Sequence, residues 1–331
     1  MPEGAPSLEV PARVIPIPAY LSPEASGVLG MGRMTAFAYP ALEDLDAWRS
    51  MIATRQEASV GILTSMAKDL PVTSKRISAR GVGVYDLVPE VVDTNDPRVY
   101  LDLHGGSFLT GSGEVCRATG ALAAMRSQMR TWSVDYRTPP DHRFPAALDD
   151  CLVVYRELLE THEPGDVVIG GTSAGGGLAA AVVLRARDEG LPLPAAVVLS
   201  TPEVDLTESG DSFHVNLGVD SMLVASLMPA NLLYADGHDL TDPYLSPLFG
   251  DFSKGFSPTI LTTGTRDLFL SNTVRMHRAL RAAGITAELH VLEAGPHGGF
   301  FGLSPEDAEI AGEIRRFITE HSSHDATSAT Q

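Results

Sequence analysis

The sequence is poor in cysteine: it holds only Cys116 and Cys151, and neither belongs to a CxxC pair or a Cys/His cluster. Two cysteines cannot build a disulfide framework, and no spacing typical of zinc ligands is present. The 331 residues suffice for a core that needs neither kind of staple. The first residues also lack the basic and apolar regions of a signal peptide. We therefore expect a cytoplasmic protein without a metal site.

Positive charge is scarce as well. Lys and Arg number 24 against 42 Asp and Glu, which gives a net charge of −18, and there is no basic run. Nucleic acids and anionic membranes attract basic patches, so neither is an expected partner. The same charge suits neutral substrates better than anionic ones. The alternative interpretation is that the charge only keeps the protein soluble.

One stretch resembles a membrane span, because Val167 to Leu184 carries no charged residue and is near the minimum length for crossing a bilayer. It contains five glycines together with Thr172 and Ser173. A buried strand, a tight turn and a buried helix explain this composition better than a membrane helix.

Short apolar runs alternate with amphipathic segments over most of the chain, which predicts a mostly parallel sheet covered by helices on both faces. The expected strands are residues 98–103, 131–136, 166–169, 195–199, 259–263 and 287–292. The expected helices are residues 42–66, 114–129, 146–161, 174–188 and 272–283, with a last one beginning at Ser304, and the tail after His321 is expected to be disordered.

Residues 1–55 and about 205–237 stand outside this alternation. We expect residues 56–331 to form a catalytic domain and the two outlying segments to fold together as a cap over one end of the sheet. The competing interpretation of the second segment is a long surface loop, but insertions of this length usually have a function.

Gly171-Thr172-Ser173-Ala174-Gly175 is a G-x-S-x-G motif that follows an apolar strand and precedes an Ala/Gly-rich helix. This strand–turn–helix context is that of a nucleophile elbow, in which the serine Oγ stands exposed at a helix N-terminus. Ser173 is therefore the candidate nucleophile, and a structural glycine turn is the alternative.

His104-Gly105-Gly106-Ser107-Phe108 follows another expected strand. The amides of Gly105 and Gly106, with that of Ala174, could converge on an oxyanion, where one donor stabilises the transition state by roughly 2.7–4 kcal/mol. His104 lies too close to this turn to act as a base, so we expect it to be structural.

A serine nucleophile needs a base and an acid that orients it. His297 lies in a glycine loop after the last strand, and Asp267 follows the strand at 259–263. Glu203 and Asp205 are the alternative acids, and Glu293 is nearer in sequence but closes a strand. The order Ser173, Asp267, His297 is that of α/β-hydrolases.

These motifs resemble those of the hormone-sensitive-lipase-like esterases of the α/β-hydrolase superfamily. His104–Phe108 is similar to the family's HGGG-aromatic motif, Tyr136–Ala147 to its Y-R-x-x-P loop, and Gly171–Gly176 to the elbow of its GTSAG subgroup. The likeness extends from about Arg98 to Phe317. Ser107 departs from the family pattern, where a third glycine stands.

The resemblance implies an α/β-hydrolase fold with a helical cap and a carboxylic ester hydrolase without metal or cofactor. It also implies a homodimer through the edge strand, here residues 287–292. The expected partner is a small neutral ester with a short, medium or compact acyl group. A lactone hydrolase with the same triad and a non-catalytic small-molecule receptor are the alternatives. Candidate pocket residues are Met31, Met34, Phe37, Ser107, Phe213 and Leu217.

Overall fold

The computed structural model describes residues 8–36 and 38–322, and within these residues the centre is one eight-stranded sheet. The strand order is β1-β2-β4-β3-β5-β6-β7-β8, in which β2 pairs antiparallel with both β1 and β4 and every other pair is parallel. Their bounds are β1 (Val72–Ala79), β2 (Val82–Pro89), β3 (Val99–Leu103), β4 (Arg130–Asp135), β5 (Val167–Thr172), β6 (Ala196–Ser200), β7 (Thr259–Gly264) and β8 (Ala287–Leu292).

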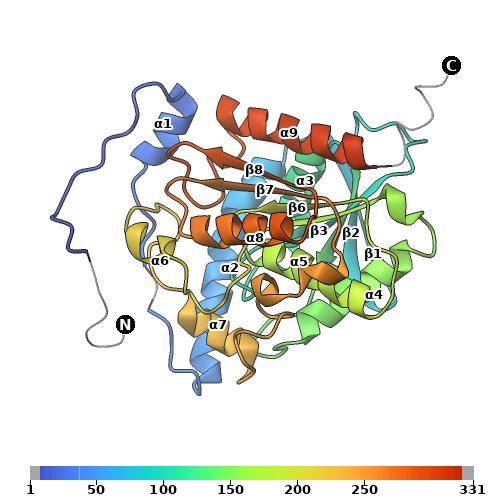
Figure 1. The fold of residues 1–331 in the computed structure, drawn as a ribbon, viewed down its shortest axis with the longest axis horizontal. Helices are drawn as coiled ribbons and strands as arrows, with labels where there is room; N and C mark the ends of the chain where they lie inside the picture. The colour runs from blue at the N-terminus through green and yellow to red at the C-terminus, as the bar shows by residue number, and fades with distance from the viewer. Residues whose placement is uncertain (1–7, 37, 323–331) are drawn as a thin grey trace.

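Helices cover both faces of the sheet (Figure 1). The helices are α1 (Pro23–Gly30), α2 (Leu45–Ala67), α3 (Glu114–Ser127), α4 (Ala146–Leu158), α5 (Ala174–Asp188), α6 (Ser212–Val215), α7 (Met228–Ala235), α8 (Leu270–Ala282) and α9 (Pro305–His321). The larger core cluster joins α4, α5 and α8 to one face, and a second cluster joins α3 and α9 to the other. This arrangement confirms the predicted mostly parallel sheet between two helical layers.

The apolar stretch from Val167 to Leu184 forms β5 and the greater part of α5, as its glycines predict. Both elements are buried in the middle of the molecule, which explains their lack of charge. No helix in the described ranges has the length and hydropathy that a bilayer crossing needs.

The hairpin of β1 and β2 is a feature that the sequence did not predict. β1 exposes most of its side chains, and its centre is the polar run Ser74-Lys75-Arg76, so it has no apolar alternation. A two-residue turn at Arg80 and Gly81, both with positive φ, joins it to β2. The hairpin extends the sheet at the edge farthest from β8.

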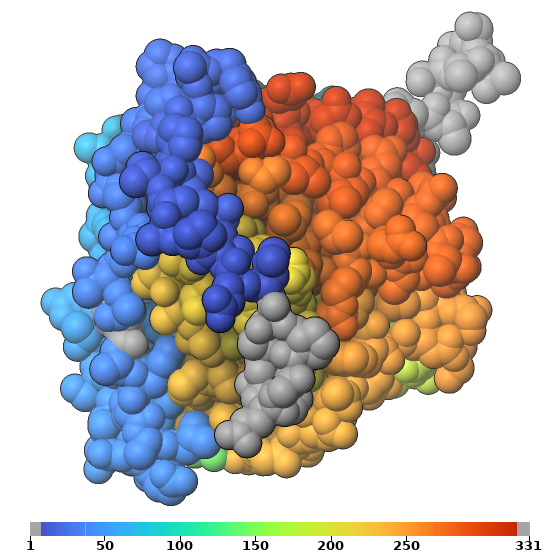
Figure 2. Space-filling view, turned by 60° about the vertical axis from the view of Figure 1, so that its left-hand side comes forward, coloured from blue at the N-terminus to red at the C-terminus, as the bar shows by residue number. Residues whose placement is uncertain are grey.

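The first part of the chain and the insertion at 205–237 contact each other. Trp48 of α2 is fully buried against Leu233 of α7. The Met34 amide donates to the Ser221 carbonyl at 2.8 Å, and Arg33 Nη1 donates to the Gly218 carbonyl at 3.0 Å. Figure 2 shows the beginning of the described chain lying across the face where this insertion is exposed. The tail after residue 322 lies outside the described residues.

Candidate active site

Ser173 lies in the sharp turn between β5 and α5, with φ 61° and ψ −126°. A Cβ on Gly175 would lie 1.9 Å from the Leu103 carbonyl oxygen, and one on Gly171 would lie 2.4 Å from the Gly175 carbonyl carbon. Only glycine fits at either position, so strand, turn and helix can approach as closely as they do. The positive φ of Ser173 is strain that the surrounding packing maintains, as is common at active sites.

The glycine turn after β3 lies directly against Ser173. A Cβ on Gly105 would be 3.3 Å from the Ser173 Cβ and 2.8 Å from the Thr172 carbonyl oxygen. Gly106 has φ 118°, and a Cβ there would meet the Thr110 carbonyl oxygen at 2.2 Å. Glycine at both positions therefore brings main-chain amides close to the serine and to the N-terminus of α5, whose first amides have no partner within the helix.

His104 anchors this turn. Its ring stacks on Tyr136 with centroids 3.9 Å apart, and the Tyr136 hydroxyl donates to the His104 carbonyl at 2.6 Å. Burial lowers the pKa of His104 to about 4, so the ring is neutral at physiological pH. These contacts agree with the structural role expected from the sequence.

His297 and Asp267 meet at the carboxyl ends of β8 and β7. His297 Nδ1 and Asp267 Oδ1 are 3.0 Å apart. The Asp267 carboxylate is fully buried and also accepts hydrogen bonds from Thr263 Oγ1 at 2.7 Å and from the Phe269 amide at 2.8 Å. The carboxylate is thus held in place independently of the histidine.

Acidic groups surround the His297 ring. Burial by itself lowers the pKa of His297, but the charge and hydrogen bond of Asp267 raise it, and Asp220 and Glu203 add to the rise. The net effect is a pKa above the usual value of about 6.5. The arrangement favours an imidazole that can take up a proton and hold the resulting charge.

Asp220 is a functional candidate that the sequence did not single out. It is fully buried, and its oxygens accept from the Leu268 amide at 2.8 Å and the His297 amide at 3.3 Å. From the same insertion, Asn216 Nδ2 donates to the Asp267 carbonyl at 2.8 Å. The insertion therefore ties together the two loops that carry the acid and the histidine. No local motif marks either residue as functional, because the contacts that tie them to the site are with main-chain groups far along the chain.

Comparison with known proteins identifies the family to which the chain is similar. Residues 100–301 match the model of a family described as having the alpha/beta hydrolase fold. An esterase of Acinetobacter venetianus is 31% identical over 228 residues, covering 67% of this chain and 75% of that protein. An acetyl-hydrolase of Streptomyces hygroscopicus is 35% identical over 191 residues, covering 57% of this chain and 64% of that protein.

Solved structures agree. The crystal structure of an esterase named E25 has a TM-score of 0.89 and 33% identity, covering 96% of this chain and 99% of that one. An esterase from the bacterial hormone-sensitive lipase family has a TM-score of 0.80 and 30% identity, covering 91% and 98%. The chain belongs to the α/β-hydrolase family. Within it, the chain is one of the hormone-sensitive-lipase-like enzymes, which are carboxylic ester hydrolases.

In this α/β-hydrolase the alternative acids have other surroundings. Asp205 accepts hydrogen bonds from Thr207 and Ser209, and it pairs with Arg275 at 2.6 Å. Glu293 is exposed. Glu203 is buried beside the elbow but does not contact the His297 Nδ1 that Asp267 holds. Among these acids, Asp267 is the one that contacts the His297 ring nitrogen.

The candidate pocket residues differ in burial and in their distance from the proposed triad. Phe213 is buried and its ring lies 5.7 Å from that of Phe269, which in turn lies 4.9 Å from the His297 ring. Ser107 is buried in the glycine turn with φ 55°. Met31, Met34 and Leu217 are largely exposed, at 70%, 49% and 49%. Phe37 lies outside the described residues. The role of all six in substrate binding stays a prediction.

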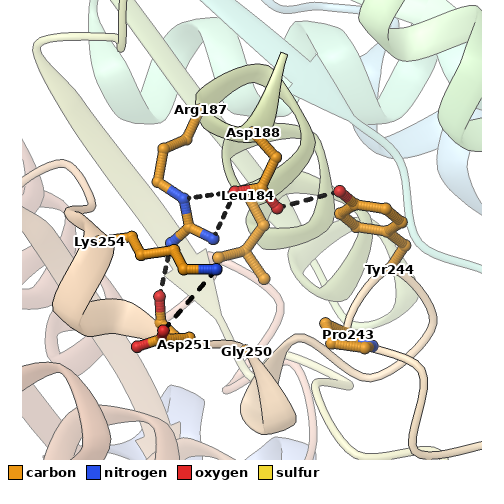
Figure 3. A pocket seen from close by; sticks show the side chains of 8 residues that line it. All are labelled: Leu184, Arg187, Asp188, Pro243, Tyr244, Gly250, Asp251 and Lys254. Carbon is orange, nitrogen blue, oxygen red and sulfur yellow. Dashed lines mark hydrogen bonds and ion pairs between the residues drawn. The ribbon is translucent and has the colours of Figure 1, made fainter. Parts of the chain in front are cut away.

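Two other features of this α/β-hydrolase lie away from Ser173. Among the described residues, Glu288, His290 and Glu313 have ligand atoms close enough together for a metal, but Arg316 already pairs with both glutamates. A surface pocket of about 250 Å³ lies at the opposite end of α5 (Figure 3). Its lining is Leu184, Arg187, Asp188, Pro243, Tyr244, Gly250, Asp251 and Lys254. The charged groups of this pocket pair with one another, so it offers no nucleophile with a base.

Proposed function

We propose that this chain is a serine carboxylesterase that works through an acyl-enzyme, with Ser173 as nucleophile, His297 as base and Asp267 as the orienting acid. The observation that carries the proposal is the 3.0 Å contact between His297 Nδ1 and Asp267 Oδ1 at the same sheet edge as the strained Ser173 turn. That contact leaves Nε2 of the ring as the nitrogen available to a serine hydroxyl.

In the proposed first half-reaction, Ser173 Oγ attacks the ester carbonyl carbon while His297 accepts its proton. The carbonyl oxygen becomes an oxyanion that the amides of Gly105, Gly106 and Ala174 stabilise. The C–O bond to the alcohol then breaks, and His297 returns the proton to the leaving oxygen. Water cleaves the acyl-enzyme by the same route and releases the acid and the free Ser173.

Asp267 has two roles in this scheme. Its hydrogen bond fixes the orientation of the ring, and its charge stabilises the imidazolium that forms during each transfer. Three partners hold the carboxylate, so little reorganisation is needed when the histidine becomes charged.

The proposed substrates are neutral esters with a short, medium or compact acyl group. The net charge of −18 disfavours anionic substrates, and one relative is named an acetyl-hydrolase. We further propose that residues 1–55 and 205–237 form a cap that limits substrate size. The contacts of Met34 with Ser221 and of Trp48 with Leu233 support this division.

The experiment that tests the substrate class is a hydrolysis panel of p-nitrophenyl esters from acetate to laurate, with lactones of matched size. We expect kcat/KM to be highest among the shorter esters and the Ser173→Ala variant to be inactive on every member. Faster hydrolysis of lactones than of all esters would replace the proposal with a lactonase. No hydrolysis of any member by the wild type would contradict both.

A further inference from the structure

Glu203 follows β6 and is fixed against the nucleophile turn through its backbone. Its amide donates to the Ser173 carbonyl at 3.0 Å. Its carbonyl oxygen lies 2.0 Å from where a Cβ on Gly177 would stand, in the first turns of α5. Because the backbone is held on both sides, the side chain starts from a fixed point next to Ser173.

The Glu203 side chain is buried without a well-formed partner. It is 1% exposed, and neither carboxyl oxygen makes a hydrogen bond of good geometry with any described residue. The Asn231 amide of α7 lies near it, and the Oδ1 of that amide also has no hydrogen bond in the described part of the chain. Three oxygen atoms at this place, between the catalytic domain and the insertion, therefore have no well-formed hydrogen bond, although the Asn231 amide is close enough to lower the pKa of Glu203.

The Glu203 carboxyl group lies near the proposed base. Glu203 and His297 are close enough for each to shift the pKa of the other. Burial, assisted by the charge of Glu208, raises the pKa of Glu203 to about 8, so the group is mostly a neutral acid at pH 7. A neutral carboxyl group both donates and accepts hydrogen bonds.

The proposed chemistry does not use this group. Asp267 occupies His297 Nδ1, and main-chain amides are the proposed oxyanion donors. A buried polar group without partners is costly, at about 1–3 kcal/mol, and such groups in native proteins call for an explanation. A ligand that supplies the missing hydrogen bonds would explain this one.

We propose that Glu203 is a specificity-determining residue whose carboxyl group hydrogen-bonds a hydroxyl group of the ester substrate. This inference rests on the proposed function of the site. A hydroxyl is favoured over a cation because a neutral acid attracts no counter-ion, and a hydroxyl matches its ability to donate and accept. The unpaired Asn231 Oδ1 is a second acceptor for the same group.

The test compares two isosteric pairs of esters. One pair carries the hydroxyl in the acyl part and the other in the alcohol part, so the test does not assume on which side of the scissile bond the hydroxyl lies. Ethyl 3-hydroxybutyrate against ethyl 3-methylbutyrate places the hydroxyl in the acyl part. 2-Hydroxyethyl butyrate against propyl butyrate places it in the alcohol part. The variants are Glu203→Met, Glu203→Gln and, as a control on the exposed side of α9, Glu309→Met. Active sites are counted with a fluorophosphonate.

The measured quantity is the kcat/KM of the hydroxylated ester divided by that of the methyl ester. In at least one pair, we expect this ratio to be about tenfold or more higher in the wild type than in Glu203→Met. Glu203→Gln should keep most of the preference, because its amide still donates and accepts, and Glu309→Met should match the wild type. The intrinsic reactivity of each ester cancels when variant and wild type are compared.

Equal ratios in wild type and Glu203→Met for both pairs would overturn the inference. A second result would also overturn it: Glu203→Met loses selectivity for butyrylcholine over its uncharged 3,3-dimethylbutyl analogue, while the ratios for the hydroxyl pairs do not change. Glu203 would then be a cation site. If Glu203→Met takes up no fluorophosphonate, Glu203→Ala provides the same comparison. A wild type that takes up none contradicts the proposed function instead.

Discussion

At the scale of single residues, the proposed chemistry depends on the charges around His297. Asp267 and Asp220 lie near one imidazole, and with a smaller effect from the ionised fraction of Glu203 they outweigh the effect of burial on its pKa. Imidazolium is therefore stabilised in the folded enzyme. A base whose pKa is raised is protonated, and unable to accept the serine proton, over a wider acidic range.

We predict that kcat/KM for a neutral ester falls as the pH drops through a midpoint above 6.5, the usual pKa of histidine. Replacing Asp220 by Asn removes one of the charges that raise the pKa, so the midpoint should move to lower pH. A pH–rate profile between pH 5 and 9 measures both. Asp239→Asn, at an exposed site, is the control.

A wild-type midpoint at or below 6.5, or a profile that stays flat down to pH 5, would contradict the assignment of His297 as base. An unchanged midpoint in Asp220→Asn would remove Asp220 from the electrostatics of the site and leave it a purely structural link.

Some residues of the candidate site could be singled out from the sequence and others could not. Ser173, Gly105 and His297 lie in short motifs at strand ends, where local sequence determines the turn. Asp220 and Glu203 carry no such mark. Asp220 acts through main-chain groups of residues 268 and 297, and the state of Glu203 comes from burial under the insertion. Only tertiary structure creates both effects.

At the scale of elements, the agreement between predicted and observed bounds differs from one element to the next. α5 and β8 have the predicted bounds, and α8 begins two residues before the expected 272. The hairpin of β1 and β2 went unrecognised, because β1 is exposed and polar and its place depends on pairing with β2. The edge position of β8 fits the predicted dimer strand, but the dimer itself stays a prediction.

The contact between α2 and α7 gives a prediction about stability. Trp48 is fully buried in the cluster that contains Leu109, just after the glycine turn, and Leu233 of α7. Trp48→Ala should lower the free energy of unfolding by about 3–5 kcal/mol, because it leaves a cavity in that cluster. Ile62→Ala on the same helix is the control, since Ile62 is 61% exposed.

Denaturation in guanidinium chloride, followed by circular dichroism, measures both variants. A loss in Trp48→Ala no larger than that in Ile62→Ala would mean that the first part of the chain contributes little to the fold, and would weaken the proposed cap.

At the scale of the whole molecule, the proposed chemistry lies at one end of the sheet, where the parallel strands have their carboxyl ends. The carboxyl ends of β3, β5, β7 and β8 supply the glycine turn, Ser173, Asp267 and His297. This is the edge where parallel α/β sheets gather their sites. The insertion reaches the same edge through Asn216 and Asp220. The net charge of −18 leaves neutral esters as the proposed substrates.

The most direct test of the central claim is intact-protein mass spectrometry after reaction with a fluorophosphonate, with p-nitrophenyl acetate hydrolysis measured in parallel. The account predicts one adduct per wild-type chain, located on Ser173, and no adduct on Ser173→Ala. The variant should also lose activity on the order of 10⁶-fold in kcat, as other serine hydrolases do. Near wild-type hydrolysis by Ser173→Ala, or an adduct at another residue, would contradict it.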